Sequence, residues 1–242
     1  MHPIKPYIGN QSHKNYMFIP DLHFPYHLDD AIKFCIKVKD DFNIPTENVF
    51  QAGDMEDNFF LGAYPKGADM PHTPDQELEH ARKLIKEMGK AFPMLNICSS
   101  NHASRYFRKA AGGELPTQVL RSYRELFNYP SLWDVQECYV VNTKKPFIAF
   151  HGEGFSDKTG RSQIMHFGMS TVFGHLHSGA TVTWMNTHTQ DLWAMNAGCL
   201  IDHSQYCFHY AKQAKLKPSL GVGVILDNGR CPIWVPYYPG VV

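Results

Sequence analysis

The stretch "STVFGHLH", residues 170–177, joins a short apolar run to a glycine and two histidines. A run of four residues rich in β-branched and aromatic side chains, followed by glycine, is typical of a short buried strand. His175 and His177 stand two positions apart, so on an extended backbone their side chains point the same way. The stretch therefore predicts a strand that presents two imidazoles to one site at its carboxyl end.

Four other apolar runs end in a similar way. They are "YMFI" (16–19), "NVFQA" (48–52), "MLNICS" (94–99) and "FIAF" (147–150). The polar residues that follow them are, in chain order, Asp21 and His23, Asp54 and Asp57, Asn101 and His102, and His151. Any one of these alone is most simply a turn residue, a helix cap or a buried histidine. The short motifs D-x-H, G-D-x-x-D, N-H and G-H-x-H in this order, each behind an apolar run, are expected in well under about one random chain in a thousand. Because ligands bind beyond the carboxyl ends of strands in open α/β sheets, the set predicts one functional site.

Helical patterns separate the first strands. Apolar residues recur at three-and-four spacing in residues 29–42 and 74–92, and residues 114–127 predict a third helix. Strands that alternate with helices favour an α/β fold with βαβ units. Near the end of the chain, 180–198 and 221–238 each predict a hairpin, so we expect an antiparallel sheet there. Residues 58–74 show no clear period and predict a loop near the site.

Composition limits the class of protein. The 242 residues are 43% hydrophobic and 13% aromatic, which suffices for a sizeable core. The 23 basic and 23 acidic residues balance, which disfavours a chain that coats nucleic acid or an anionic membrane. No apolar run approaches the roughly 20 residues that span a bilayer, and the amino end lacks the apolar core of a secretory signal. The six cysteines are scattered without a CxxC pair, which disfavours a disulfide scaffold. We expect a single domain over residues 1–242, in the cytoplasm and without membrane contact.

The motif order resembles that of the calcineurin-like binuclear metallophosphoesterases, whose signature is D-x-H, G-D-x-x-D, G-N-H-D/E, H and G-H-x-H. The chain is most similar to the compact, uncapped members found in bacteriophages and bacteria, and the match covers residues 21–177. It departs in the third motif, where the family's glycine is Ser100 and its acidic residue after the histidine is Ala103. The resemblance implies a four-layer α/β/β/α sandwich of mixed sheets with antiparallel carboxyl-terminal strands. For a phage protein the location would be the host cytoplasm.

The resemblance also implies two divalent metal ions. One would be held by Asp21, His23, Asp54 and His177, and the other by Asp54, Asn101, His151 and His175, with Asp54 as the bridge. A mixed set of nitrogen and oxygen ligands suits Mn, which we favour, and also Fe, Zn, Ni or Mg. Two such ions clamp a phosphoryl group and activate a bridging hydroxide that attacks phosphorus.

Three further residues receive roles in this chemistry. The resemblance makes His102 the general acid that protonates the leaving group, and Asp57 the carboxylate that orients it. Arg105 is a candidate phosphate contact, because a guanidinium fits two phosphate oxygens, and Asn101 also lies where substrate would bind. His203 and His209 lie outside the signature, and we expect them in the core or beside the site.

The substrate is open among several phosphate esters. With no capping or DNA-binding segment recognised and no net positive charge, we expect a phosphorylated small molecule and favour a 5′-mononucleotidase-like nucleotide phosphohydrolase. Phe59, Phe60 and Tyr64 of the loop would stack on the base. One alternative is a phosphodiesterase acting on DNA, RNA or a cyclic nucleotide, with basic residues in 105–109 and 211–217 steering a strand. A weaker alternative is a non-catalytic protein that binds metal or a partner.

Overall fold

Two mixed β-sheets with helices in about equal proportion make up the α/β fold of the computed structural model, which describes residues 5–7, 14–62, 72–205 and 217–240. The first sheet has the order β12-β11-β2-β3-β4-β5. Its parallel strands are β2 (Tyr16–Ile19), β3 (Val49–Gln51), β4 (Leu95–Cys98) and β5 (Trp133–Gln136). Helix α1 (Ala31–Asp41) links β2 to β3 and α2 (Pro74–Ala91) links β3 to β4, so the predicted βαβ units are confirmed.

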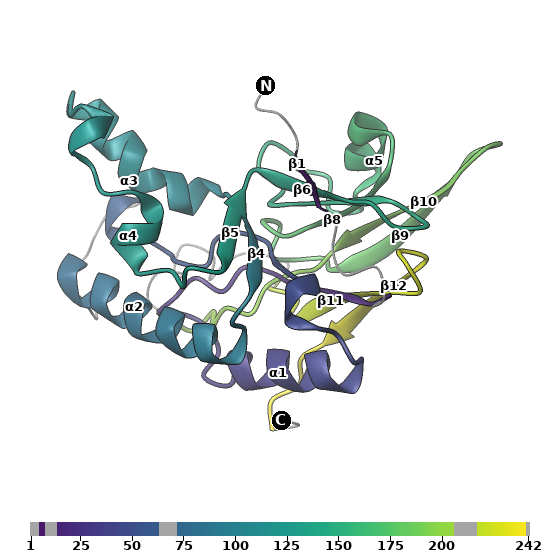
Figure 1. Ribbon diagram of the computed structural model, residues 1–242, viewed down its shortest axis with the longest axis horizontal. Helices are drawn as coiled ribbons and strands as arrows, with labels where there is room; N and C mark the ends of the chain where they lie inside the picture. Colours follow the sequence, from purple (N-terminus) through teal and green to yellow (C-terminus); the bar gives the residue numbers. More distant parts are fainter. Residues whose placement is uncertain (1–4, 8–13, 63–71, 206–216, 241–242) are drawn as a thin grey trace.

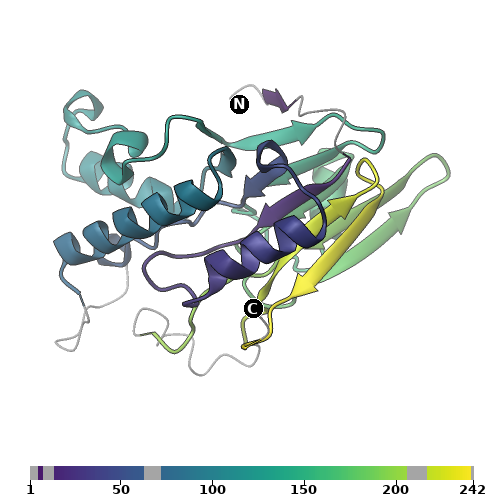
Figure 2. The ribbon, with the colours of Figure 1, turned by 60° about the horizontal axis from the view of Figure 1, so that its bottom comes forward.

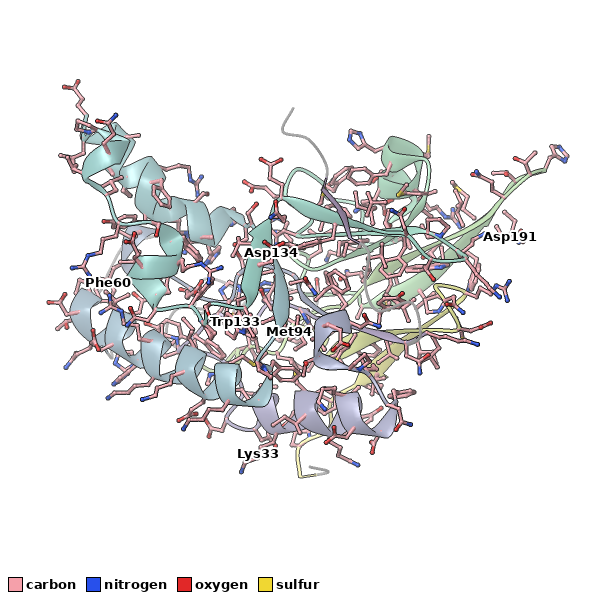
Figure 3. The ribbon with its side chains drawn as sticks, viewed as in Figure 1. Lys33, Phe60, Met94, Trp133, Asp134 and Asp191 are labelled. Carbon is pink, nitrogen blue, oxygen red and sulfur yellow. The ribbon has the colours of Figure 1, made fainter. Side chains whose placement is uncertain are left out.

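The second sheet has the order β1-β6-β7-β8-β10-β9. Its strands are β1 (Lys5–Tyr7), β6 (Cys138–Val141), β7 (Phe147–Phe150), β8 (Ser170–Phe173), β9 (Thr181–Asn186) and β10 (Asp191–Asn196). Strands β7 and β8 are parallel and are linked through α5 (Arg161–Phe167). The β9–β10 hairpin projects from one end of the molecule, where Asp191 is labelled (Figure 3).

Alternate residues of the central strands pack into different cores. In β2, Met17 and Ile19 pack with residues of α1 and α2, whereas Phe18 packs with residues of the second sheet. In β7, Phe147 faces the first sheet and Ile148 packs with α5. Helices α1 and α2 therefore lie against one sheet, and α5 lies on the opposite side of the molecule (Figures 1 and 2). This alternation follows from the two-residue repeat of a strand.

The helix predicted over 114–127 is wrong for most of its length. Only α4 (Tyr123–Phe127) is α-helical, preceded by a 3₁₀ turn over Thr117–Val119. Ser122 begins α4 because its side chain accepts the N–H of Glu125, whose carboxylate accepts the N–H of Ser122 in return. Helix α3 (Asn101–Gly112), which was not predicted, begins at the cap residue Ser100.

The two carboxyl-terminal hairpins are present but do not form one antiparallel sheet. Strand β10 pairs with β8 of the second sheet, and β11 (Gly221–Leu226) pairs with β2 of the first. The outer strands β9 and β12 (Cys231–Pro236) remain half-exposed, while β10 and β11 are almost entirely buried. Each inner strand thus satisfies its backbone on both edges, because a buried backbone group without a partner is costly.

Two sequence expectations hold in the described part of the chain. Cys35 and Cys98 are buried free thiols, in keeping with the absence of a disulfide scaffold. No helix there is both long enough and apolar enough to cross a bilayer.

Candidate metal centre

The polar residues that follow five strands meet at the junction of the two sheets. Strands β2, β3 and β4 of the first sheet and β7 and β8 of the second all end there. One group, whose ligand atoms lie within 4.8 Å of one another, consists of Asp21, His23, Asp54 and His177. A second consists of Asp54, His151 and His175. The structure therefore brings the predicted ligands together in two groups that share Asp54, and these buried groups could hold metal.

In the first group the imidazoles and carboxylates face a common point. His177 Nε2 lies 2.9 Å from Asp21 Oδ2 and 3.3 Å from His23 Nε2. His23 Nε2 lies 3.6 Å from Asp54 Oδ2. Burial, followed by the charge of His102, lowers the pKa of His23, so the neutral imidazole that a metal requires is favoured.

The second group includes Asn101, whose carboxamide contacts a histidine. His151 Nε2 lies 2.8 Å from Asn101 Oδ1, 3.1 Å from His175 Nδ1 and 3.5 Å from Asp54 Oδ2. His151 Nδ1 lies 3.0 Å from the carbonyl oxygen of Ala52, which can only accept a hydrogen bond. The proton of neutral His151 therefore resides on Nδ1, and the lone pair of Nε2 points into the group.

Asp54 is the centre of both groups and is 2% exposed. Burial alone raises the pKa of its carboxyl, but the imidazoles of His151, His102 and His23, when protonated, outweigh burial and hold that pKa well below its ordinary value. Its backbone N–H donates to Ser100 Oγ at 2.8 Å, and its Oδ1 accepts the His102 N–H at 3.1 Å. An ionised carboxylate is thus fixed where two cations would share it.

Asp21 provides the test of whether a cation fits. The residue is fully buried, and its Oδ1 has no hydrogen-bond partner among the described residues, while Oδ2 accepts the N–H of His175 at 2.8 Å. An orphaned buried carboxylate oxygen is costly, and a divalent cation among nitrogen and oxygen ligands would satisfy it. A Cβ at Gly174 would lie 2.4 Å from this oxygen, so glycine is required beside it. The donor set therefore fits a metal ion.

Backbone strain collects at the same residues. His23, Asp54 and His175 have φ values of 53°, 47° and 64°, in the left-handed region that non-glycine residues rarely adopt. Such conformations persist where surrounding structure fixes them, and they cluster at functional sites. Three strained ligands indicate that the site geometry is held at the expense of local backbone stability.

His102 and Asp57 lie beside the ligands. Asp57 Oδ1 is 3.1 Å from His102 Nδ1 and 2.5 Å from His23 Nδ1, so one carboxylate contacts both histidines. Although burial by itself raises the pKa of Asp57, hydrogen bonds from the two histidines lower it below its ordinary value. Burial lowers the pKa of His102, but the charge of Asp54 and the hydrogen bond to Asp57 more than compensate and raise it.

Arg105 lies against His102. Its NH1 group donates to the carbonyl oxygen of Asp57 at 2.8 Å, and its NH2 group lies 2.8 Å from His102 Nε2. Because a guanidinium only donates, Nε2 accepts in this arrangement and a neutral His102 carries its proton on Nδ1, 2.7 Å from the Asp57 carbonyl oxygen.

The three aromatic residues expected to stack on a base do not lie together on an open surface in the described part of the chain. Phe59 is only 7% exposed and packs with Tyr26 and Ile201, so the prediction that it stacks on a base is wrong. Phe60 is half-buried where α2, α3 and α4 come together (Figure 3). Tyr64 lies outside the described residues, as does most of the predicted loop. The sequence around Phe59 could not reveal its burial, because that burial depends on residues distant in the chain.

Of the two histidines outside the signature, only His203 lies within the described residues. His203 is exposed, so the expectation that it lies in the core is wrong. His209 lies outside the described residues.

Ser100 and Gly174 are the residues that sequence reasoning missed. Ser100 Oγ accepts the N–H groups of both Asp54 and Ala103, so it begins α3 and orients the shared carboxylate. A serine immediately before an amphipathic helix is the signal that could have identified this role. No protein-family model matches the chain, and no curated protein matches it either.

Proposed function

We propose that the protein is a metal-dependent phosphoester hydrolase with a binuclear centre. The observation that carries the proposal is the pair of buried ligand groups that share Asp54 at the junction of two sheets. Sheets packed face to face, with α1 and α2 on one outer face and α5 on the other, fit the four-layer α/β/β/α sandwich of the calcineurin-like metallophosphoesterases. A single domain of the compact, uncapped type accommodates both sheets.

The proposed ligands come from the ends of five strands. Asp21, His23, Asp54 and His177 would hold one ion, and Asp54, Asn101, His151 and His175 the other. We favour Mn for both, and Fe, Zn, Ni or Mg also suit such mixed ligands. When bound, the two ions supply Lewis-acid stabilisation of the phosphoryl oxygens and an activated water nucleophile.

His102 would serve as the general acid. It must carry a proton on Nε2 to protonate the leaving oxygen, while Asp57 accepts from Nδ1 and holds the ring in place. Arg105 NH2 now lies 2.8 Å from Nε2, so it must leave that nitrogen before the acid can act. The oxygens of a bound phosphate are an alternative acceptor for the same N–H groups. Arg105 would thus give up its hydrogen bond to His102 and donate to the phosphate of the substrate instead.

The substrate is proposed to be a phosphate ester of a nucleotide, either a monoester or a diester. The sequence favours a 5′-mononucleotide. A phosphodiester is the second candidate, and an open basic groove next to Asn101 and His175 favours it. An intact acid pair, His102 with Asp57, disfavours a non-catalytic role.

The test uses metal-stripped protein to which Mn²⁺ is returned. Hydrolysis of p-nitrophenyl phosphate, bis(p-nitrophenyl) phosphate and deoxynucleoside 5′-monophosphates is followed together with metal bound per chain. Asp54→Asn should lose both metal and turnover, because both ions lose a charged ligand. The matched control is Asp191→Asn on the projecting hairpin, which should behave as wild type (Figure 3). Full metal occupancy with a wild-type rate in Asp54→Asn would sink the proposal.

A further inference from the structure

A basic groove runs from the metal centre along α3. It has a volume of about 850 Å³ and begins at Asn101 and His175. Arg105, Arg108 and Lys109 line it from one face of α3. This face concentrates positive charge in a chain whose net charge is zero, so local charge and overall charge predict different partners.

Arg105 and Arg108 are held in place by hydrogen bonds to backbone carbonyl groups, which do not neutralise their charge. Arg108 NH2 donates to the carbonyl oxygen of Asn101 at 2.8 Å, and Arg105 NH1 donates to that of Asp57. Neither guanidinium forms an ion pair with a carboxylate in the part of the chain that the structure describes. A guanidinium has five N–H donors, so each retains donors for another acceptor. The charges are pre-positioned and remain available to an anion.

The groove extends beyond the reach of one phosphate. At 1.5 Å per residue, the backbone of Arg108 and Lys109 lies about 10 to 12 Å along the helix axis from Asn101. Arg108 folds back toward Asn101 through its hydrogen bond, whereas exposed Lys109 lies further along the groove. Acidic Glu153 also lines the groove and would repel a phosphate at its own position. A second phosphate therefore has a favourable place along α3.

We propose that Arg108 and Lys109 bind a phosphate flanking the one that is hydrolysed, and that the substrate is a single-stranded nucleic acid. The inference rests on the proposed phosphoester hydrolysis for its reacting phosphate. A strand supplies phosphates at regular intervals, and an open groove lets it continue past the metal centre. A mononucleotide has no second phosphate for Arg108 and Lys109 to bind. The local geometry therefore favours the phosphodiester over the mononucleotide.

The first experiment measures binding without requiring hydrolysis. A fluorescent single-stranded oligodeoxynucleotide is titrated with metal-stripped protein at several salt concentrations. Arg108→Ala/Lys109→Ala should weaken binding about tenfold at low salt and reduce the slope of log affinity against log salt by about 0.7, the contribution of one single-strand phosphate contact. Lys109→Ala alone leaves the bond from Arg108 to Asn101 intact and should reduce the slope by about half as much.

The matched control removes two lysines from another exposed basic surface. Lys83→Ala/Lys86→Ala on α2 removes the same number of charges away from the groove and should leave the slope unchanged. An equal effect in both double variants would overturn the inference, because charge alone would then explain binding. Circular dichroism checks that each variant is folded.

Activity then separates this inference from the proposed function. With Mn²⁺ present, Arg108→Ala/Lys109→Ala should lower kcat/KM about tenfold on the oligonucleotide and leave bis(p-nitrophenyl) phosphate unchanged. If the double variant loses as much kcat/KM on a deoxynucleoside triphosphate as on the oligonucleotide, the second phosphate belongs to a polyphosphate. The inference of a single-stranded nucleic acid substrate would then be overturned. Unchanged kcat/KM on the oligonucleotide would overturn the flanking site while hydrolysis stands. If wild type hydrolyses no ester, the proposed function fails and binding alone tests the groove.

Discussion

Replacing Ser100 by alanine should destabilise the protein and loosen its metal centre at the same time. Ser100 Oγ is the acceptor for two backbone donors, the N–H of Asp54 at 2.8 Å and the N–H of Ala103 at 3.3 Å. Loss of a helix cap costs about 0.5–2 kcal/mol. Leaving the buried Asp54 N–H unsatisfied costs about 1–3 kcal/mol more. We expect a total loss of about 1.5–5 kcal/mol in the free energy of unfolding.

Urea unfolding of metal-stripped protein measures this loss, and Ser122→Ala is the matched control. Ser122 caps α4, so its replacement removes a cap without touching the metal centre and should cost about 1 kcal/mol. The difference between the two variants isolates the hydrogen bond to Asp54. Because that bond orients the shared carboxylate, Ser100→Ala should also weaken Mn²⁺ binding about 10- to 100-fold by calorimetry, and Ser122→Ala should not. If Ser100→Ala costs no more than Ser122→Ala and binds Mn²⁺ as wild type does, the role assigned to Ser100 is wrong.

Three further changes test other parts of the site and its surroundings. His102→Ala should lower kcat about 10²–10⁴-fold on alkyl phosphates but spare nitrophenyl esters, whose leaving group needs no proton; equal losses would remove its role as acid. Gly174→Ala should abolish metal binding measured by calorimetry, because the new Cβ would lie 2.4 Å from Asp21 Oδ1; wild-type affinity would contradict this. Burial raises the pKa of Glu77 to about 7 although it accepts the Phe59 N–H, so the stability it contributes is complete below about pH 4.5 and is lost as pH rises toward 7. Glu77→Gln should remove about 3 kcal/mol of that pH dependence in urea unfolding between pH 4.5 and 7, and an unchanged profile would refute the assignment.

The sequence predicted the elements, and the residues of the groups that could hold metal, where these depend on local spacing. The apolar run 170–173 forms strand β8, and the two histidines after it reach the metal centre. The hairpins at 180–198 and 221–238 also form where expected. In each case the signal lies within a few neighbouring residues, because the repeat of a strand and the turn that follows it are properties of the local backbone.

Residue spacing gave wrong or incomplete predictions where a helix boundary depends on a capping residue. Residues 114–127 carry helical spacing, yet the capping box at Ser122 restricts the helix to α4. Asn101 and His102 belong to the N-H motif and also begin the amphipathic helix α3, which their spacing alone does not predict. A cap decides where a helix begins because it satisfies N–H groups that have no partner within the helix.

Only the tertiary structure decided how distant segments combine. The sequence placed both hairpins in one antiparallel sheet, whereas β10 and β11 pair with different sheets. It placed Phe59 at the substrate, whereas Tyr26 and Ile201 bury it. Strand pairing and burial depend on which remote partners satisfy backbone hydrogen bonds and exclude water, and residue spacing does not carry that information. The candidate ligands could therefore be identified from the sequence, whereas the groove, the shared acceptor Ser100 and the junction of the sheets arise only from packing.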